Sequence, residues 1–177
     1  MVVLVVMGVC GCGKSTIGKA LAIEYGVEFC DADDVHPASN VEKMRRGESL
    51  TDLDRLPWLQ LLHTRLASWE SGRCDSVRGV SGVMACSALK QQYRDILSGH
   101  KQSDTNQTIF VYLRGTREVI LERLSTRRGH FMPLSLLDSQ LSDLEEPWHS
   151  CVTVDITGDI DSVVARVKEQ VDLHVLH

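Results

Sequence analysis

The sequence lacks a long apolar segment, a block of basic residues and a high content of aromatic residues. Without an apolar run long enough to cross a bilayer, no part of it is expected to span a membrane. The formal net charge is −5, and proteins that bind nucleic acid or anionic membranes usually carry the opposite charge in a clear patch. We therefore expect neither partner, and any anionic ligand must be held by a local group of positive side chains.

Two further signals are missing. The apolar start, residues 2–7, has no basic region before it, so we expect a buried first strand and no signal peptide. The six cysteines form no Cys-x-x-Cys pair and no zinc-finger spacing with histidine. We expect reduced thiols and a cytoplasmic protein.

Short apolar runs alternate with segments of helical periodicity along the chain. This alternation predicts a single α/β domain over residues 1–177, with a parallel sheet covered by helices on both faces. The third predicted strand is weak, because Gly82 dilutes its apolar character, while Trp58 and Trp69 are expected in the core. The predicted strands are 2–7, 27–30, 82–86, 109–113 and 151–156. The predicted helices are 15–25, 40–46, 54–71, 88–98, 116–127, 134–144 and 159–171.

Residues 8–15 fit the phosphate-binding pattern G-x-x-x-x-G-K-[ST], with a buried strand before it and a helix after it. Glycines let successive N–H groups point at phosphate oxygens, and the following helix adds the positive end of its dipole. Lys14 is expected to reach the β- and γ-phosphates of ATP, and the Ser15 hydroxyl to bind Mg²⁺. The predicted nucleotide-binding residues are Gly8, Val9, Cys10, Gly11, Cys12, Gly13, Lys14, Ser15 and Thr16.

Two thiols, Cys10 and Cys12, lie within this loop. A helix N-terminus and a nearby lysine both favour a thiolate. We therefore expect lowered thiol pKa values and sensitivity to mild oxidants.

Several classes of protein share such a loop. A GTPase is disfavoured because Asn-Lys-x-Asp is absent and because the Asp-x-x-Gly at 155–158 comes too late in the chain. A kinase for a small molecule fits better, because Asp31 and Asp33 follow the second predicted strand, where open α/β sheets bind ligands. Arg123 and Arg127 suit a lid over the phosphates. The aspartates could instead cap a helix, and the arginines could form a solvated face.

Along its length the chain contains the longer motifs MGVCGCGKST, DADDVHP, NVEKMRRGESLTDLDRLPWL, ACSALKQQYRDIL, VYLRG, RRGHFMPLSLLDSQLSDLEEP and VDI. Through these motifs the chain resembles the gluconokinases, which are P-loop sugar-acid kinases related in fold to shikimate and nucleotide kinases. The resemblance implies a five-stranded parallel sheet, a mobile lid near residues 123–135, a homodimer, and the reaction of MgATP with D-gluconate to give 6-phosphogluconate, which feeds the pentose phosphate pathway.

The resemblance also suggests catalytic roles. Asp33 would orient the gluconate 6-hydroxyl and accept its proton, while Asp31 would hold Mg²⁺ through water, although these two roles could be exchanged. Lys14 and Arg127 would stabilise the transferring phosphoryl group, and Arg123 would assist.

Gluconate is an anion, so its carboxylate needs a cationic partner. Lys90 and Arg94 lie four apart on one predicted helical face and could bind it together, with Arg55 as a third candidate. His36 and His130 could bind the substrate hydroxyls. Two alternatives stay open: a kinase for another small hydroxy acid or polyol, and a nucleotide-binding protein without catalysis.

Overall fold

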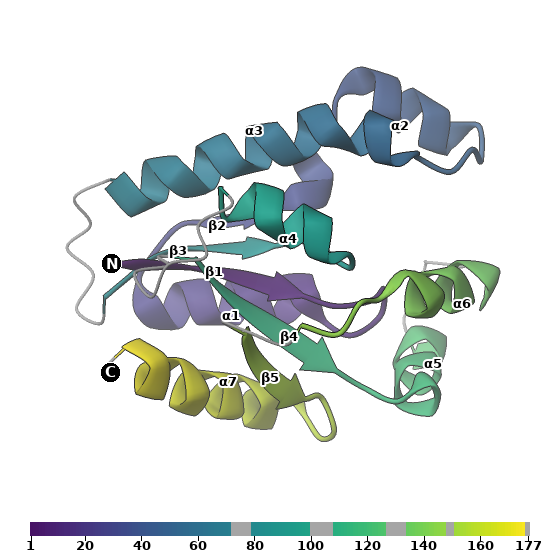
Figure 1. Ribbon diagram of the computed structural model, residues 1–177. Coiled ribbons are helices and arrows are strands. Elements are labelled where there is room, and N and C mark those ends of the chain that lie inside the picture. The colour runs from purple at the N-terminus through teal and green to yellow at the C-terminus, as the bar shows by residue number, and fades with distance from the viewer. Residues whose placement is uncertain (72–78, 100–107, 127–133, 148–150, 176–177) are drawn as a thin grey trace.

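Five parallel strands form one sheet in the computed structural model (Figure 1), which describes residues 1–71, 79–99, 108–126, 134–147 and 151–175. The strand order is β2-β3-β1-β4-β5, and every neighbouring pair is parallel. The predicted sheet is therefore confirmed. The strands are β1 (Val2–Met7), β2 (Phe29–Asp31), β3 (Val80–Ala85), β4 (Thr108–Arg114) and β5 (Cys151–Asp155).

Helices cover both faces of the sheet (Figure 1). Helices α1 (Lys14–Tyr25) and α7 (Ile160–Val175) lie on one face, and α3 (Asp52–Ser71) and α4 (Gln91–Leu97) lie on the other. Alternate residues of β1 supply the two cores, because successive strand side chains point to opposite faces. Leu4 and Val6 pack in the core that contains α1 and α7 residues, whereas Val3 and Val5 pack with α3 and α4 residues.

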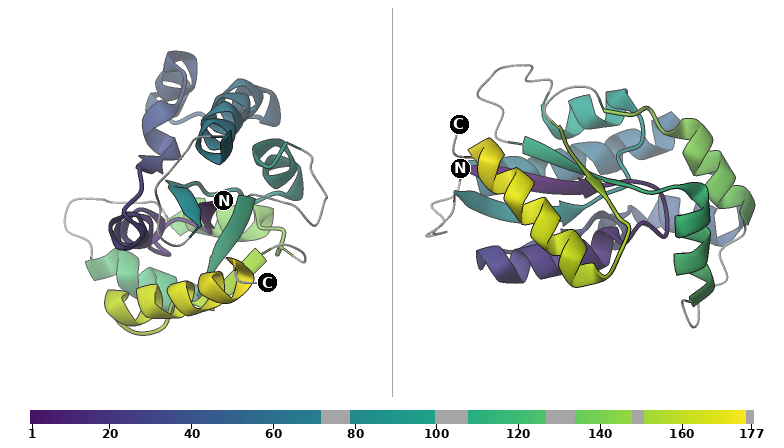
Figure 2. Two further views of the ribbon diagram at one scale, coloured as in Figure 1. Left: turned by 90° about the vertical axis from the view of Figure 1, so that its left-hand side faces the viewer. Right: turned by 90° about the horizontal axis from the view of Figure 1, so that it is seen from below.

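The carboxyl ends of the strands meet at one edge of the sheet, as they must when all strands are parallel. The remaining described helices gather beyond that edge, and the N-terminus and the end of α7 lie at the opposite edge (Figures 1 and 2). Open parallel sheets bind their ligands at such a carboxyl edge. The helices near it are η1 (Ala32–Val35), α2 (Ala38–Arg45), α5 (Arg117–Thr126) and α6 (Leu134–Asp143).

Strand β3 is buried along its whole length, and it begins at Val80, two residues before the predicted start. Its glycine has a packing role, because a Cβ on Gly82 would lie 2.4 Å from two ring atoms of Trp69. Trp69 and Trp58 both lie in the core, as predicted. The glycine thus makes room for an indole that packs directly against the strand.

Helix α4 begins later than predicted. Ala88 has a φ of 43°, outside the right-handed helical region, and Lys90 is extended just before the first helical turn at Gln91. Residues 88–90 therefore form a loop at the carboxyl edge of the sheet.

None of the described helices combines the length and the apolar character that a membrane span requires.

We predict that Gly82→Ala destabilises the protein by about 1–3 kcal/mol, because the added methyl group overpacks the contact with Trp69. Urea unfolding would measure the change. In a Trp69→Leu background the same substitution should cost much less, since the two positions are in contact. An equal cost in both backgrounds would contradict this account.

Candidate active site

The phosphate-binding loop connects β1 to α1 and needs its glycines. Gly8, Gly11 and Gly13 have φ values of 138°, 78° and 103°, a region that disfavours residues with a Cβ. A Cβ on Gly11 would also lie 2.7 Å from Leu124 Cγ. No side chain caps the N-terminus of α1, so the first amides of this helix can bind an anion.

Ser15 joins this loop to the end of β2. Its hydroxyl donates a hydrogen bond of 2.6 Å to Asp31 Oδ2. Lys14 Nζ donates to the Val9 carbonyl oxygen at 3.0 Å and thus folds back over the loop. A hydroxyl beside a carboxylate presents the hard oxygen ligands that Mg²⁺ prefers, so the residues fit the expected ion.

Asp31 and Asp33 have different surroundings. Asp31 Oδ1 accepts a hydrogen bond from the Asp33 backbone N–H at 3.2 Å and so caps η1, which means that both carboxylate oxygens of Asp31 are engaged. The Asp33 side chain is 80% exposed and points one oxygen toward His36 Nε2, 3.9 Å away.

His36 forms part of the wall beside Asp33. Its side chain is only 7% exposed, and its ring stacks on Trp58 with centroids 4.1 Å apart and an interplanar angle of 13°. Trp58 is fixed in turn, because its Nε1 donates to the Ala32 carbonyl oxygen at 2.9 Å. Burial lowers the pKa of His36. Its Nδ1 is buried and makes no hydrogen bond with any residue that the structure describes.

Two predicted cations, Lys90 and Arg55, flank the ring of Tyr93, at 5.6 and 5.8 Å from its centroid. Both approach the same carboxylate: Asp52 Oδ1 lies 3.2 Å from Lys90 Nζ and 3.8 Å from Arg55 Nη1. Tyr93 also donates its hydroxyl hydrogen to Asp52. The cluster shows that this place can hold a carboxylate.

The prediction that Lys90 and Arg94 share one helical face is wrong, because Lys90 precedes α4. Arg94 is 3% exposed and turns into the protein. Its Nη1 donates to the carbonyl oxygens of Ala88 and Leu89, and its Nη2 donates to the Glu145 carbonyl oxygen, each at 2.9 Å. Arg94 therefore holds the loop 88–90 in shape and does not face Lys90.

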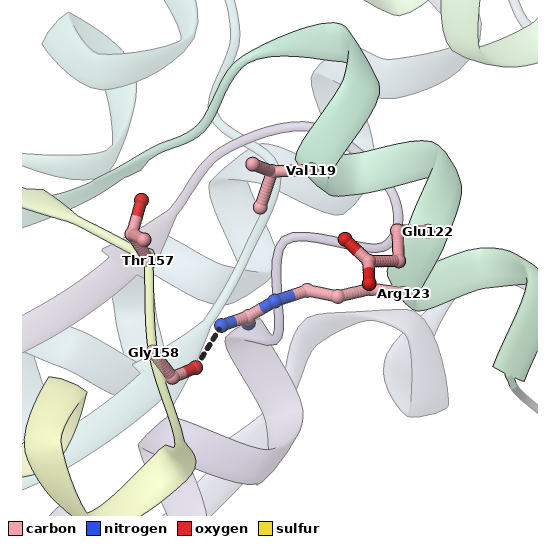
Figure 3. A pocket seen from close by; sticks show the side chains of 5 residues that line it. All are labelled: Val119, Glu122, Arg123, Thr157 and Gly158. Carbon is pink, nitrogen blue, oxygen red and sulfur yellow. Dashed lines mark hydrogen bonds between the residues drawn. The ribbon is translucent and has the colours of Figure 1, made fainter.

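A hollow of about 390 Å³ adjoins the phosphate-binding loop on the side of α5. Arg123 crosses to the segment after β5, where its Nη2 donates to the Gly158 carbonyl oxygen at 3.2 Å (Figure 3). The same nitrogen donates to the Ile156 carbonyl oxygen, and Nη1 donates to the Cys12 carbonyl oxygen at 3.3 Å. The hollow is lined by Gly11, Gly13, Thr16, Ile17, Arg123, Gly158, Asp159 and Ile160.

Sequence reasoning missed the part of the hollow that follows β5. The sequence indicated residues 155–158 only as a possible switch motif. The useful signal was their place at the end of a predicted strand, together with the glycine at 158. Gly158 has a φ of 101°, which residues with a Cβ rarely adopt. Two predicted residues, Arg127 and His130, lie outside the described residues, as does most of the predicted lid.

The expected lowering of the thiol pKa values in the loop is wrong. Burial raises the pKa of both Cys10 and Cys12, and this desolvation outweighs the positive charge of Lys14. Cys12 is completely buried, and a Cβ on Gly8 would lie 2.9 Å from its sulfur. These thiols therefore act as packing groups beneath the loop.

Comparisons with known proteins agree with this geometry. The family model described as "Shikimate kinase" matches residues 10–171. A "Probable gluconokinase" of Xenopus tropicalis is 39% identical, with 96% of this chain and 93% of the relative covered. The "Thermosensitive gluconokinase" of Escherichia coli K12 is 41% identical, with 94% and 86% covered.

A solved structure gives the same result. The crystal structure of a gluconokinase from Sinorhizobium meliloti 1021 superimposes with a TM-score of 0.85 at 38% identity, and the match covers 99% of this chain and 94% of that one. Relatives of this identity and coverage, with the loop and the aspartates in place, show that the chain is a member of the gluconokinase family of P-loop kinases.

Proposed function

We propose that the protein transfers the γ-phosphoryl group of ATP to the 6-hydroxyl of D-gluconate. The observation that carries the proposal is the hydrogen bond between Ser15 and Asp31, which brings the phosphate-binding loop beside the acidic segment after β2. A donor site and an acceptor site are thereby adjacent at one edge of the sheet. Proximity of this kind is the main requirement of phosphoryl transfer.

The donor side consists of the loop, Lys14 and the hollow beside α5. Ser15 and Asp31 would hold Mg²⁺, which neutralises phosphate charge when it is bound. The hollow has room for the nucleoside, and Arg123 fixes its wall by bonding to both Cys12 and Gly158. Arg127 remains our candidate for the lid arginine that stabilises the transferring group.

The structure favours Asp33 over Asp31 as the group that orients the acceptor hydroxyl. Both oxygens of Asp31 already accept hydrogen bonds, from Ser15 and from the Asp33 N–H, whereas the Asp33 carboxylate is exposed. His36, which is packed on Trp58, places its Nε2 3.9 Å from Asp33 Oδ1 and so supports this carboxylate. A loose transition state needs little proton removal until late, so holding the hydroxyl in line is the larger contribution.

On the acceptor side, Lys90 and Arg55 are proposed to bind the gluconate carboxylate. In this structure Asp52 accepts from Lys90 and lies beside Arg55. A substrate carboxylate can bind Lys90 and Arg55 in the same way, because charge-assisted hydrogen bonds to a carboxylate are among the stronger ones in proteins. His130 stays a candidate for binding hydroxyls.

We also propose that the enzyme works as a homodimer in the cytoplasm and supplies the pentose phosphate pathway. The support is the family resemblance, together with free thiols at all five cysteines of the described residues, since free thiols are usual in reducing compartments. Light scattering during gel filtration would give the oligomeric state.

The acceptor is tested by ADP release from MgATP with D-gluconate, other aldonates, shikimate, AMP or water. We predict that turnover with gluconate far exceeds the rest. Turnover confined to another acceptor would overturn the assignment of gluconate, and ATP binding without any turnover would favour a protein that only binds nucleotide.

Replacing Asp33 by Asn should lower kcat by about 10²–10⁴-fold, because the neutral amide holds the hydroxyl less firmly than the carboxylate does and cannot accept its proton. The KM for ATP should change little, since the phosphate-binding loop is untouched. Asp34→Asn is the matched control, because Asp34 is the next residue of η1 and is exposed. Steady-state kinetics would measure both variants, and near-normal kcat in Asp33→Asn would refute the role.

Replacing Lys90 by Met should raise the KM for gluconate by about 10–100-fold, the loss expected for one charge-assisted hydrogen bond. A neutral polyol of similar length, used as a poor substrate, should show no such change. Lys168→Met is the control, because Lys168 pairs with Glu24 on the far side of the sheet. An unchanged KM for gluconate would remove Lys90 from the site.

A further inference from the structure

A polar side chain of helix α6, Gln140, contacts the phosphate-binding loop. The backbone N–H of Cys10, which the sequence predicts to bind phosphate, instead donates a hydrogen bond of 2.6 Å to Gln140 Oε1. A backbone N–H can only donate, so the amide oxygen of Gln140 must be the acceptor. Cys10 is only 8% exposed, and a buried amide without its partner would be costly.

The rest of α6 is anchored around this contact. Leu137, one turn earlier, is fully buried in the core that also contains Val9 and Cys12 of the loop. Asp138 accepts a hydrogen bond of 2.8 Å from Arg117 Nε of α5. Gln140 is thus carried by a helix that shares a core with the loop through Leu137 and pairs with α5 through Asp138.

The segment just after α6 contacts the acceptor side. Glu145 Oε2 accepts from the Gln91 N–H at 2.6 Å, and the Glu145 N–H donates to the Leu89 carbonyl oxygen at 2.9 Å. Lys90 lies between those two contacts in the chain. One short stretch, residues 137–145, therefore touches both the loop expected to hold ATP and the loop that presents Lys90.

We propose that Gln140 is a positioning residue for phosphoryl transfer. By holding the Cys10 peptide it fixes the direction of the N–H groups of the phosphate-binding loop, and through α6 it sets the loop against the acceptor side. This inference rests on the proposed function. Reactions that depend on alignment lose rate steeply with small displacements, by about 10²-fold for 1 Å, so one restraint on the loop can control turnover without touching the reacting atoms.

Two substitutions separate this role from simple packing. Gln140→Met keeps the length of the side chain but removes the acceptor, so kcat should fall about tenfold or more while the KM for gluconate stays within about twofold. Gln140→Glu keeps an acceptor for the Cys10 N–H and adds a negative charge near the phosphates. It should recover most of kcat at saturating MgATP but show a KM for ATP raised about tenfold.

Ser139→Ala is the matched control, because Ser139 is the preceding residue of α6 and is exposed; its kinetics should equal those of the unchanged enzyme. Thermal unfolding would check that each variant is folded. If Gln140→Met does not fold, Gln140→Asn, which is one methylene shorter, gives the same comparison. Wild-type kcat and KM in a folded Met or Asn variant would overturn the proposal.

Hydrogen exchange of the Cys10 amide, followed by NMR, tests the contact without any acceptor substrate. The amide should exchange slowly in the unchanged protein and in Gln140→Glu, and about tenfold or more faster in Gln140→Met. Equal exchange in all three proteins would contradict the proposal. This result does not depend on gluconate, so it distinguishes failure of the Gln140 role from failure of the proposed reaction.

Discussion

The hydrogen bond from Ser15 to Asp31 is the contact on which the arrangement of the site depends. It connects the first turn of α1, the helix that follows β1, to the end of β2. Strands β1 and β2 are not neighbours, since β3 lies between them. The parallel sheet brings both carboxyl ends to one edge, and this contact then determines which side chains meet there. The phosphate-binding loop and Lys14 lie on the Ser15 side of the contact, and Asp33 lies two residues beyond Asp31 on the other side.

The acceptor side is held by contacts between segments far apart in the chain. Arg94 and Glu145, 51 positions apart, together support the loop that carries Lys90. Trp58 of α3 supports η1 through the Ala32 carbonyl group and His36 through stacking. The stretches ACSALK, LEEP and DADDVH, which carry much of the family resemblance, are therefore neighbours in space, because Glu145 donates to Leu89 and Asp31 pairs with Ala85 in the sheet.

Sequence patterns predicted the sheet, most helices and the phosphate-binding loop, because apolar periodicity and glycine spacing are local signals. They failed where a distant partner decides the outcome. Arg94 turns into the protein because it donates to the Glu145 carbonyl oxygen. Gly82 fits inside a buried strand because Trp69 fills the space beside it. The pKa values of Cys10 and Cys12 depend on burial, which a charge argument from neighbouring residues omitted.

The central claim is that the loop and Asp33 deliver the phosphoryl group to the terminal hydroxyl of gluconate. Proton-coupled ³¹P NMR of the product formed from MgATP and D-gluconate tests it most directly. A phosphate on C6 is split into a triplet by the two methylene protons, and we predict that signal. A doublet, from a phosphate on a secondary hydroxyl, or an unsplit signal, from an acyl phosphate, would contradict the account.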